Sequence, residues 1–258
     1  MSELTQDVTA ADLATYALRL GDDALILGQR LGEWVGHAPA LELEMAIANM
    51  GLDLIGEGKL YLTLAGEMEG QGRDADALAF TRDVLDFTNL LIVERPNGDW
   101  ADSIVRHYLF SVAHRLRHER LADSAEPRLA EIAQKTLPEI AYHIRFSRDW
   151  MLRLGGGTDE SHARLQAAVN RIWRFTGEMV QSDALEDRLA AAGVAPCGAD
   201  FAADWRAEVT AVCDQAGVTI PEVKQMLAGG RDGRHSEHLG HLLAELQFMQ
   251  RAYPGLEW

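Results

Sequence analysis

Apolar residues recur every three or four positions along most of the chain, the spacing that gathers side chains on one face of an α-helix. One such stripe predicts a helix over residues 10–36, and a second predicts a helix over residues 40–69. The second helix holds four glycines, each of which costs about 1 kcal/mol relative to alanine in a helix interior. We therefore expect these glycines to mark close contacts between helices. They are Gly51, Gly56, Gly58 and Gly66.

Three further long helices follow the same period. One covers residues 100–123, another covers residues 127–154 with a kink or restart at Pro138, and the last covers residues 158–180. Shorter helices are predicted at 200–216, 220–228 and 235–252, and only residues 87–94 suggest an extended segment. Internal repeats and Pro-rich linkers are absent from the sequence. We predict an all-α fold in which residues 1–258 form a single domain of long antiparallel helices.

The charge balance is acidic, because 40 Asp and Glu residues against 24 Lys and Arg residues give a formal net charge of −16. Such a chain repels phosphate backbones and anionic lipid surfaces, so we expect no nucleic-acid or membrane partner. No apolar run approaches the ~20 residues of a membrane span, and no secretion signal is recognisable. The two cysteines, Cys197 and Cys213, lack a CxxC spacing. We expect a cytoplasmic protein without a thiolate-bound metal.

Ferritin-like di-iron proteins hold their metals with Glu-x-x-His pairs on helices, because side chains three residues apart converge on one interior point. This sequence contains no Glu-x-x-His. Two Asp-x-x-His pairs follow Gly-rich breaks, where an acid suits the first turn of a helix. Three Glu-x-x-x-His pairs also occur, and Glu139 with His143 is the most site-like, because His37 lies at the end of its helix and Glu237/His241 at the start of an amphipathic one. The other pairs are Glu33/His37, Glu237/His241, Asp159/His162 and Asp232/His235.

Two clusters of basic side chains remain. His235, His238 and His241 are spaced three apart, which fits either a metal-binding strip or a solvated edge. The stretch RHYLFSVAHRLRHER at 106–120 is the only locally positive part of the chain. It is interpreted as a surface face paired with nearby acids, or as a docking face for an acidic partner or a nucleotide-bearing ligand. Its candidate residues are Arg106, Arg115, Arg117 and Arg120, accompanied by His107, His114 and His118.

No nucleophile triad, Walker loop or strand-borne GxGxxG can be found, so the residues alone supply no catalytic set. Several blocks nevertheless resemble the C-type structural subunits of bacterial ring-1,2-phenylacetyl-CoA epoxidases, also called phenylacetate-CoA oxygenases, within the ferritin-like superfamily. The resemblance runs from about residue 16 to Trp258. The blocks are LRLGDDALILGQRLGEWVGHAP, ANMGLDLIGEG, FTRDVLDFTNLLIVERPNGDWADSI, YHIRFSRDWMLRLGGGTDES and HSEHLGHLLAELQFMQRAYPG.

The resemblance implies a ferritin-like antiparallel four-helix bundle with additional short helices and a degenerate metal site. It implies a homologous catalytic subunit as partner, in a larger complex that uses O2 to epoxidise the ring of phenylacetyl-CoA. In that complex the catalytic partner carries the di-iron centre, and a separate reductase carries flavin and an iron–sulfur cluster. The resemblance therefore assigns this chain no cofactor and no catalytic residue.

Laid on the catalytic subunit's pattern, the resemblance matches His143 to a ligand but places Ile140 where the paired Glu belongs. Asp53 approximates a second acid, and Gly56 replaces its His. Ser111 stands at a carboxylate position, and Asp22 or Asp23 lies near the remaining one. We expect Asp53 and His143 to join a buried polar network instead of binding metal.

Two alternatives stay open. The first is an independent di-iron or di-manganese oxidase that uses Glu139, His143 and acids from other helices. The second, compatible with a structural subunit, is a contribution to coenzyme A binding through the 106–120 stretch or through Arg145 and Arg148.

Overall fold

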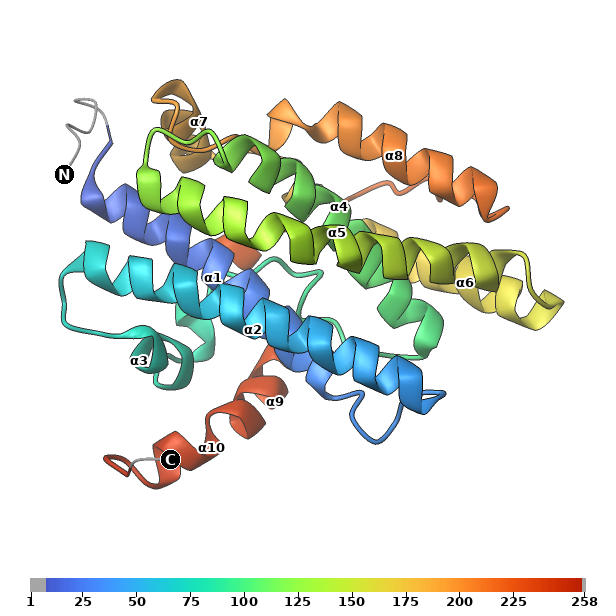
Figure 1. The fold of residues 1–258 in the computed structure, drawn as a ribbon, viewed down its shortest axis with the longest axis horizontal. Helices are drawn as coiled ribbons and strands as arrows, with labels where there is room; N and C mark the ends of the chain where they lie inside the picture. Colours follow the sequence, from blue (N-terminus) through green and yellow to red (C-terminus); the bar gives the residue numbers. More distant parts are fainter. Residues whose placement is uncertain (1–7, 257–258) are drawn as a thin grey trace. The chain divides into compact units, whose positions relative to one another are not determined.

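The computed structural model describes residues 8–256, and all regular secondary structure in that range is helical, as the sequence predicts (Figure 1). The long helices are α1 (Ala10–Gly32), α2 (Leu41–Glu69), α4 (Trp100–Leu121) and α5 (Pro127–Gly155). The shorter helices are α3 (Ala75–Phe80), α6 (Asp159–Ile172), α7 (Ala184–Ala191), α8 (Ala202–Gln215), α9 (Glu237–Leu246) and α10 (Phe248–Ala252). Single 3-10 turns are η1 (Val84–Asp86), η2 (Trp173–Phe175), η3 (Gly177–Met179), η4 (Gly198–Asp200) and η5 (Gly230–Asp232).

The described residues divide into two compact units. The first contains the chain up to Pro96 together with the C-terminal segment from Gly229, and the second contains residues 97–228. Each unit is built on one antiparallel pair of long helices, α1 with α2 and α4 with α5 (Figure 1). No helix among residues 8–256 is long and apolar enough to cross a membrane. The single domain expected for residues 1–258 stays a prediction.

In the first unit, glycines bring α1 and α2 close together. A β-carbon at Gly28 would lie 3.0 Å from the carbonyl oxygen of Gly51, and one at Gly58 would lie 3.2 Å from that of Gly21. A β-carbon at Gly66 would lie only 2.1 Å from the carbonyl oxygen of Arg73, in the loop that follows α2. The predicted close contacts are therefore confirmed for Gly51 and Gly58, and Gly66 contacts a loop instead. Gly56 differs, since a β-carbon there would meet nothing within 4 Å.

In the second unit, α6 and α8 pack on the α4–α5 pair. The indole of Trp205 on α8 donates a 3.0 Å hydrogen bond to the carbonyl oxygen of Leu109 on α4, and Trp100 meets the ring of Trp150 edge-on. Helix α5 passes through Pro138 as one element, so the predicted restart does not occur. Trp100 at the start of α4 thus packs on α5, and His107, two turns further along α4, is buried.

Several predicted elements are corrected. The helix expected over 158–180 ends at Ile172 and is followed by two 3-10 turns, in the second of which Gly177 packs closely against Met226. Residues 220–228 form no helix, since the amide of Leu227 donates to the carbonyl of Arg174 instead of to its own segment. Residues 87–94 are not a strand. The amide of Leu90 is bound by a side chain, so no ladder forms there.

We predict opposite effects for two alanine substitutions in α2. Gly56→Ala should raise the free energy of unfolding by about 1 kcal/mol, because alanine favours a helix and the site is open. Gly66→Ala should lower it by roughly 1–3 kcal/mol, because the new methyl group collides with backbone. Urea unfolding of the purified chain, followed by circular dichroism, measures both. Destabilisation by Gly56→Ala would show that this glycine is needed inside the chain.

Candidate functional site: buried carboxylates and histidines

The first helix carries a fully buried carboxylate, Asp22, which is one of the positions expected to retain a trace of a metal site. The Arg82 guanidinium forms a bidentate ion pair with both of its oxygens. The amide and hydroxyl of Thr88 donate to Oδ2 at 2.8 and 3.0 Å. The same guanidinium lies over the Phe87 ring, 4.1 Å from its centroid. Four donors therefore occupy the lone pairs through which Asp22 would bind a cation.

The adjacent carboxylate, Asp23, is also paired with an arginine and accepts a backbone hydrogen bond. Arg231 in the C-terminal segment donates to its two oxygens at 3.1 and 2.7 Å, and the amide of Leu90 donates at 2.7 Å. Arg231 also donates to the carbonyl oxygens of Arg19 and Thr88. One arginine from the end of the chain thus binds α1 and the loop before α4 at once. Bidentate geometry of this kind is the strongest form that a protein ion pair takes.

A third buried carboxylate, Glu94, lies at the end of that loop. It accepts hydrogen bonds from the Asn89 side chain at 3.0 Å, the Ser236 amide at 2.6 Å and Nδ1 of His235 at 2.8 Å. The other ring nitrogen of His235 lies 2.8 Å from the carbonyl oxygen of Phe87. Because both ring nitrogens face acceptors, only the imidazolium form can donate to both. Glu94 and His235 are therefore an ion pair.

The pKa values of this pair shift in the directions that its geometry demands. Burial alone would raise the pKa of Glu94, but the hydrogen bonds from His235 and Ser236 outweigh it and hold that pKa below its ordinary value. Burial alone would lower the pKa of His235, but the bonds to Glu94 and to the Phe87 carbonyl raise it. The ion pair thus anchors the C-terminal segment to the loop that precedes α4.

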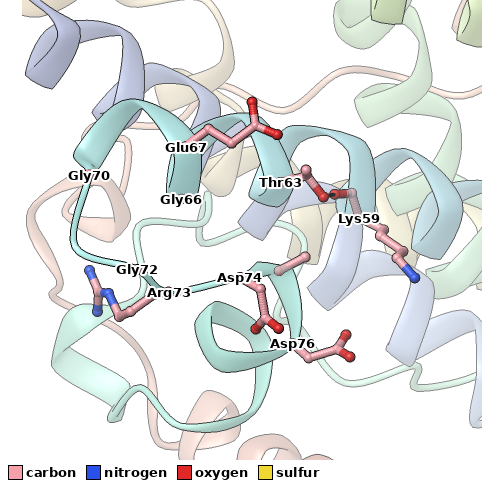
Figure 2. A pocket seen from close by; sticks show the side chains of 10 residues that line it. Lys59, Thr63, Gly66, Glu67, Gly70, Gly72, Arg73, Asp74 and Asp76 are labelled. Carbon is pink, nitrogen blue, oxygen red and sulfur yellow. Dashed lines mark hydrogen bonds between the residues drawn. The ribbon is translucent and has the colours of Figure 1, made fainter.

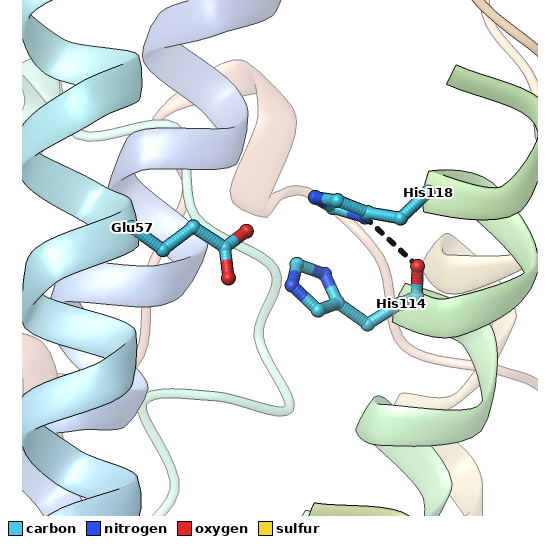
Figure 3. A group of neighbouring side chains, drawn as sticks. All are labelled: Glu57, His114 and His118. Atoms are coloured by element: carbon cyan, nitrogen blue, oxygen red, sulfur yellow. Dashed lines mark hydrogen bonds between the residues drawn. The ribbon is translucent and has the colours of Figure 1, made fainter. Parts of the chain in front are cut away.

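In the second unit, the interior face of α4 carries three buried histidines. The ring centroid of His107 lies 5.0 Å from that of His143 on α5, and the ring centroids of His114 and His118 are 4.0 Å apart. Nδ1 of His118 lies 2.9 Å from the carbonyl oxygen of His114 (Figure 3). Neither ring nitrogen of His107 has a hydrogen-bond partner among the described residues. Burial, with His143 nearby, lowers the pKa of His107 well below its ordinary value, so this ring is neutral.

The remaining positions expected from the resemblance are placed as follows. On the interior face of the α4–α5 pair, Ser111 and Ile140 are buried beside the histidines. On α2, Asp53 is half-buried and Gly56 is exposed. The buried carboxylate of α2 is Glu57, one turn further on, which the sequence reasoning did not select. The polar network expected for Asp53 and His143 stays a prediction.

Most of the Glu–His and Asp–His spacings have local explanations. His37 is exposed and its Nδ1 lies 3.1 Å from the Val35 carbonyl oxygen, while Nδ1 of His162 lies 3.0 Å from that of Gly155. Glu139 is half-buried, but Ile140 and His143 occupy the interior face of the same helix. The proposed strip of three histidines is not assembled, because His235 binds Glu94 ahead of α9. Asp159 and Asp232 are exposed, Glu237 and His241 likewise, and His238 is half-buried.

The positive stretch on α4 is not one surface face, because Arg106 and Arg117 are buried. Arg106 donates to the Asn97 side chain at 2.6 Å, and Arg117 lies 3.9 Å from Glu186. The other two arginines reach other elements of the second unit. Arg115 pairs with Glu119 at 2.6 Å and with Glu208 of α8 at 2.5 Å, and Arg120 pairs with Asp204 of α8 at 3.0 Å. Four arginines thus pack or tether α4, and their role towards a ligand stays a prediction.

The first unit also contains a pocket of about 570 Å³ at the end of α2 (Figure 2). Its wall is formed by the last turns of α2, the loop through Gly70 and Gly72, and the start of α3. Charged side chains of both signs line it, including Lys59, Glu67 and Asp74. None of the site residues expected from the sequence lies in its wall. The pocket is therefore separate from the buried carboxylates described above.

Comparisons with known proteins agree over the whole chain. The family model described as "Phenylacetic acid catabolic protein" matches residues 1–258. The chain is 48% identical over 246 residues to the C-type subunit of the 1,2-phenylacetyl-CoA epoxidase of Escherichia coli (strain K12). The matched region covers 95% of this chain and 99% of that protein.

We predict that breaking the Asp22–Arg82 pair is costly. Arg82→Met should lower the free energy of unfolding by about 3–5 kcal/mol, because it leaves an uncompensated carboxylate in the interior. The double variant Asp22→Leu/Arg82→Met should recover most of that loss, because no charge then remains buried. Arg234→Met is the matched control. It breaks an exposed 2.8 Å pair with Asp232 and should cost less than about 1 kcal/mol. Urea unfolding measures all three, and equal losses in Arg82→Met and the control would refute the assignment.

We predict a pH-dependent contribution from Glu94 and His235. The raised pKa of His235 makes its contribution complete below its ordinary pKa of 6.5 and lost as the pH rises through the folded-state pKa. The lowered pKa of Glu94 makes its contribution complete above 4.5 and lost as the pH falls through the folded-state pKa. The pair therefore stabilises the fold most between about pH 4.5 and 6.5.

Unfolding free energies of the wild type, His235→Gln, Glu94→Gln and the double variant across pH 5–9 provide the measurement. The coupling energy from this cycle should be largest near pH 6 and should shrink towards pH 9. A coupling energy that is independent of pH would mean that His235 is neutral throughout.

Proposed function

We propose that this chain, which belongs to the phenylacetic acid catabolic protein family, is a non-catalytic structural subunit of a phenylacetyl-CoA 1,2-epoxidase complex. The observation that carries the proposal is the 48% identity to the C-type epoxidase protein along 99% of that protein's length. An all-helical, ferritin-like fold is what the family implies, and it agrees with the helices described above. The proposed location is the cytoplasm, where acyl-CoA substrates of catabolic enzymes are found.

The lack of catalysis in this chain is proposed from its own side chains. A pair of irons needs several carboxylate and imidazole ligands with free lone pairs. Here four donors from Arg82 and Thr88 already bind the carboxylate of Asp22, and a metal would have to displace them. Ile140 and Gly56 have no donor atoms at all. The residues present at these positions therefore do not fit a di-iron centre.

Within the proposed complex, the partner is a homologous subunit that carries the di-iron centre, and a reductase with flavin and an iron–sulfur cluster supplies electrons. When bound in that partner, the di-iron group provides the oxygen chemistry that converts the aromatic ring to an epoxide. This chain would supply a rigid helical surface that supports the catalytic subunit and holds it in the assembly. Its buried carboxylates Asp22, Asp23 and Glu94 are each paired with a cation inside the chain, which suits a scaffold.

Coenzyme A contact by this subunit is a further part of the proposal that the sequence raised. Arg115 and Arg120 are already paired with Glu208 and Asp204. Arg145 is exposed and lies over the Tyr142 ring, 5.3 Å from its centroid. Arg145 is therefore a better candidate for a phosphate contact than Arg115 and Arg120 of α4.

We expect the chain to co-elute with the homologous catalytic subunit in gel filtration when the two are co-expressed. Iron should follow the catalytic subunit, and the chain purified alone should hold well below one iron. Ring epoxidation of phenylacetyl-CoA should require the catalytic subunit and reductase. Two separately eluting proteins would refute the subunit role. Two irons bound per isolated chain, with oxidase activity, would instead support the independent di-iron or di-manganese oxidase.

A further inference from the structure

Helix α2 exposes a row of large apolar side chains on its outward face. Leu41, Met45 and Leu52 are 68%, 60% and 65% exposed, and Ile55 is 40% exposed. At about 100° per residue these four lie within an arc of roughly 80° on the helix, over a length of about 21 Å. We call them the outward stripe. Contiguous exposed apolar surface of this kind marks an interaction site more often than chance exposure does.

The outward stripe is not the side by which α2 joins its own unit. That side carries Ile47, Met50 and Leu54, which are buried at 2% exposure or less. It also carries Gly51 and Gly58, the glycines that meet α1. Helix α2 is therefore apolar on two faces, and the described residues 8–256 cover only one of them. A helix that is apolar on two sides is expected to be covered on both.

Gly56 supplies an independent observation. It lies beside Leu52 on the exposed side of α2, where glycine is a weaker helix former than alanine. The other glycines of α2 are explained by close contacts inside the chain, whereas a β-carbon at Gly56 would meet nothing within 4 Å. A glycine in this position allows another backbone to approach the helix closely. The approaching element must come from outside the described fold.

Charge identifies the kind of occupant. Glu42 and Glu44 flank the outward stripe on opposite sides of the helix. Helix α2 as a whole holds six acidic residues and one basic residue. A second copy of this chain, with its net charge of −16, would bring like charges together. The complementary surface is a helix whose apolar face is bordered by Lys or Arg.

We propose that the outward stripe of α2 docks such a helix from the catalytic partner, with Gly56 as the point of closest approach. This inference rests on the proposed function, because it names the surface through which the structural subunit would hold its partner. An interface of standard size buries about 800 Å² on each side, so the stripe is the apolar centre of a larger contact. Acidic side chains around it would favour the basic border and accelerate association.

The test compares affinities for the homologous catalytic subunit, measured by calorimetry or biolayer interferometry. Leu52→Glu should weaken binding roughly tenfold or more, because it places a charge at the centre of the apolar contact. The matched control is Leu85→Glu, at an exposed leucine of the same unit outside α2, which should bind within about twofold of wild type. Circular dichroism and urea unfolding should show both variants folded like the wild type.

Two further variants separate the parts of the proposal. Gly56→Leu should leave the isolated chain folded but weaken binding at least as much as Leu52→Glu, because the side chain blocks close approach. Glu42→Lys/Glu44→Lys should slow association and reduce its dependence on salt.

The outcomes are distinguishable. If the wild type fails to bind the catalytic subunit at all, the proposed function is lost. If the wild type binds and Leu52→Glu binds equally well, only the docking surface is overturned. If the wild type self-associates and Leu52→Glu abolishes that self-association without affecting the catalytic subunit, the stripe joins two copies of this chain and the proposal is wrong.

Discussion

The neutralisation of buried carboxylates governs the organisation of the first unit. Moving a carboxylate into the interior costs several kcal/mol unless a cation and hydrogen-bond donors accompany it. Asp22, Asp23 and Glu94 are all buried, and each is matched by one cation, namely Arg82, Arg231 and His235. The partners lie 60, 208 and 141 positions away along the chain. The segment after Gly229 must therefore return to α1, because two of the three cations lie in it. Helix periodicity alone imposes no such closure.

The same ion pairs limit the ability of these carboxylates to bind a metal or to transfer a proton. A carboxylate can bind a metal or move a proton only if it keeps a free lone pair and an adjustable charge. Bidentate guanidinium pairing removes both, and Asp22 is the clearest instance because a guanidinium, an amide and a hydroxyl all donate to it. In the second unit the ring of His107 is kept neutral and has no hydrogen-bond partner among the described residues, and it lies against the ring of His143. A site of this composition stabilises a fold, and this is the physical basis for proposing a supporting role in an oxygenase complex.

Periodicity was sufficient to locate α1, α2, α4 and α5 to within a few residues, because a long apolar stripe repeats its signal over many turns. It was insufficient at residues 173–180 and 220–228, where packing of Gly177 and a long-range bond from Leu227 override local preference. The candidate site was harder to predict from the sequence. Arg106 and Arg117 carry charge and so suggested a surface, yet nothing local reveals that they are buried. Asp22 and Arg82 are 60 positions apart, so no short sequence motif reveals their pairing. On α2 the buried acid is Glu57, four residues after the expected Asp53.

Helix α2 shows how a subunit's stability and its assembly compete within one element. A glycine in an open helical position lowers the stability of the isolated chain, whereas Gly51 and Gly58 are justified by the approach of α1. Natural proteins retain locally unfavourable residues mainly where a function depends on them. The acids beside the stripe, of which Glu42 is exposed and Glu44 is half-buried, favour hydration of the free chain and discourage self-pairing, so the apolar surface can be tolerated before a partner covers it. An interior held by these ion pairs would then leave the outer face of α2 free to be shaped by the partner it meets.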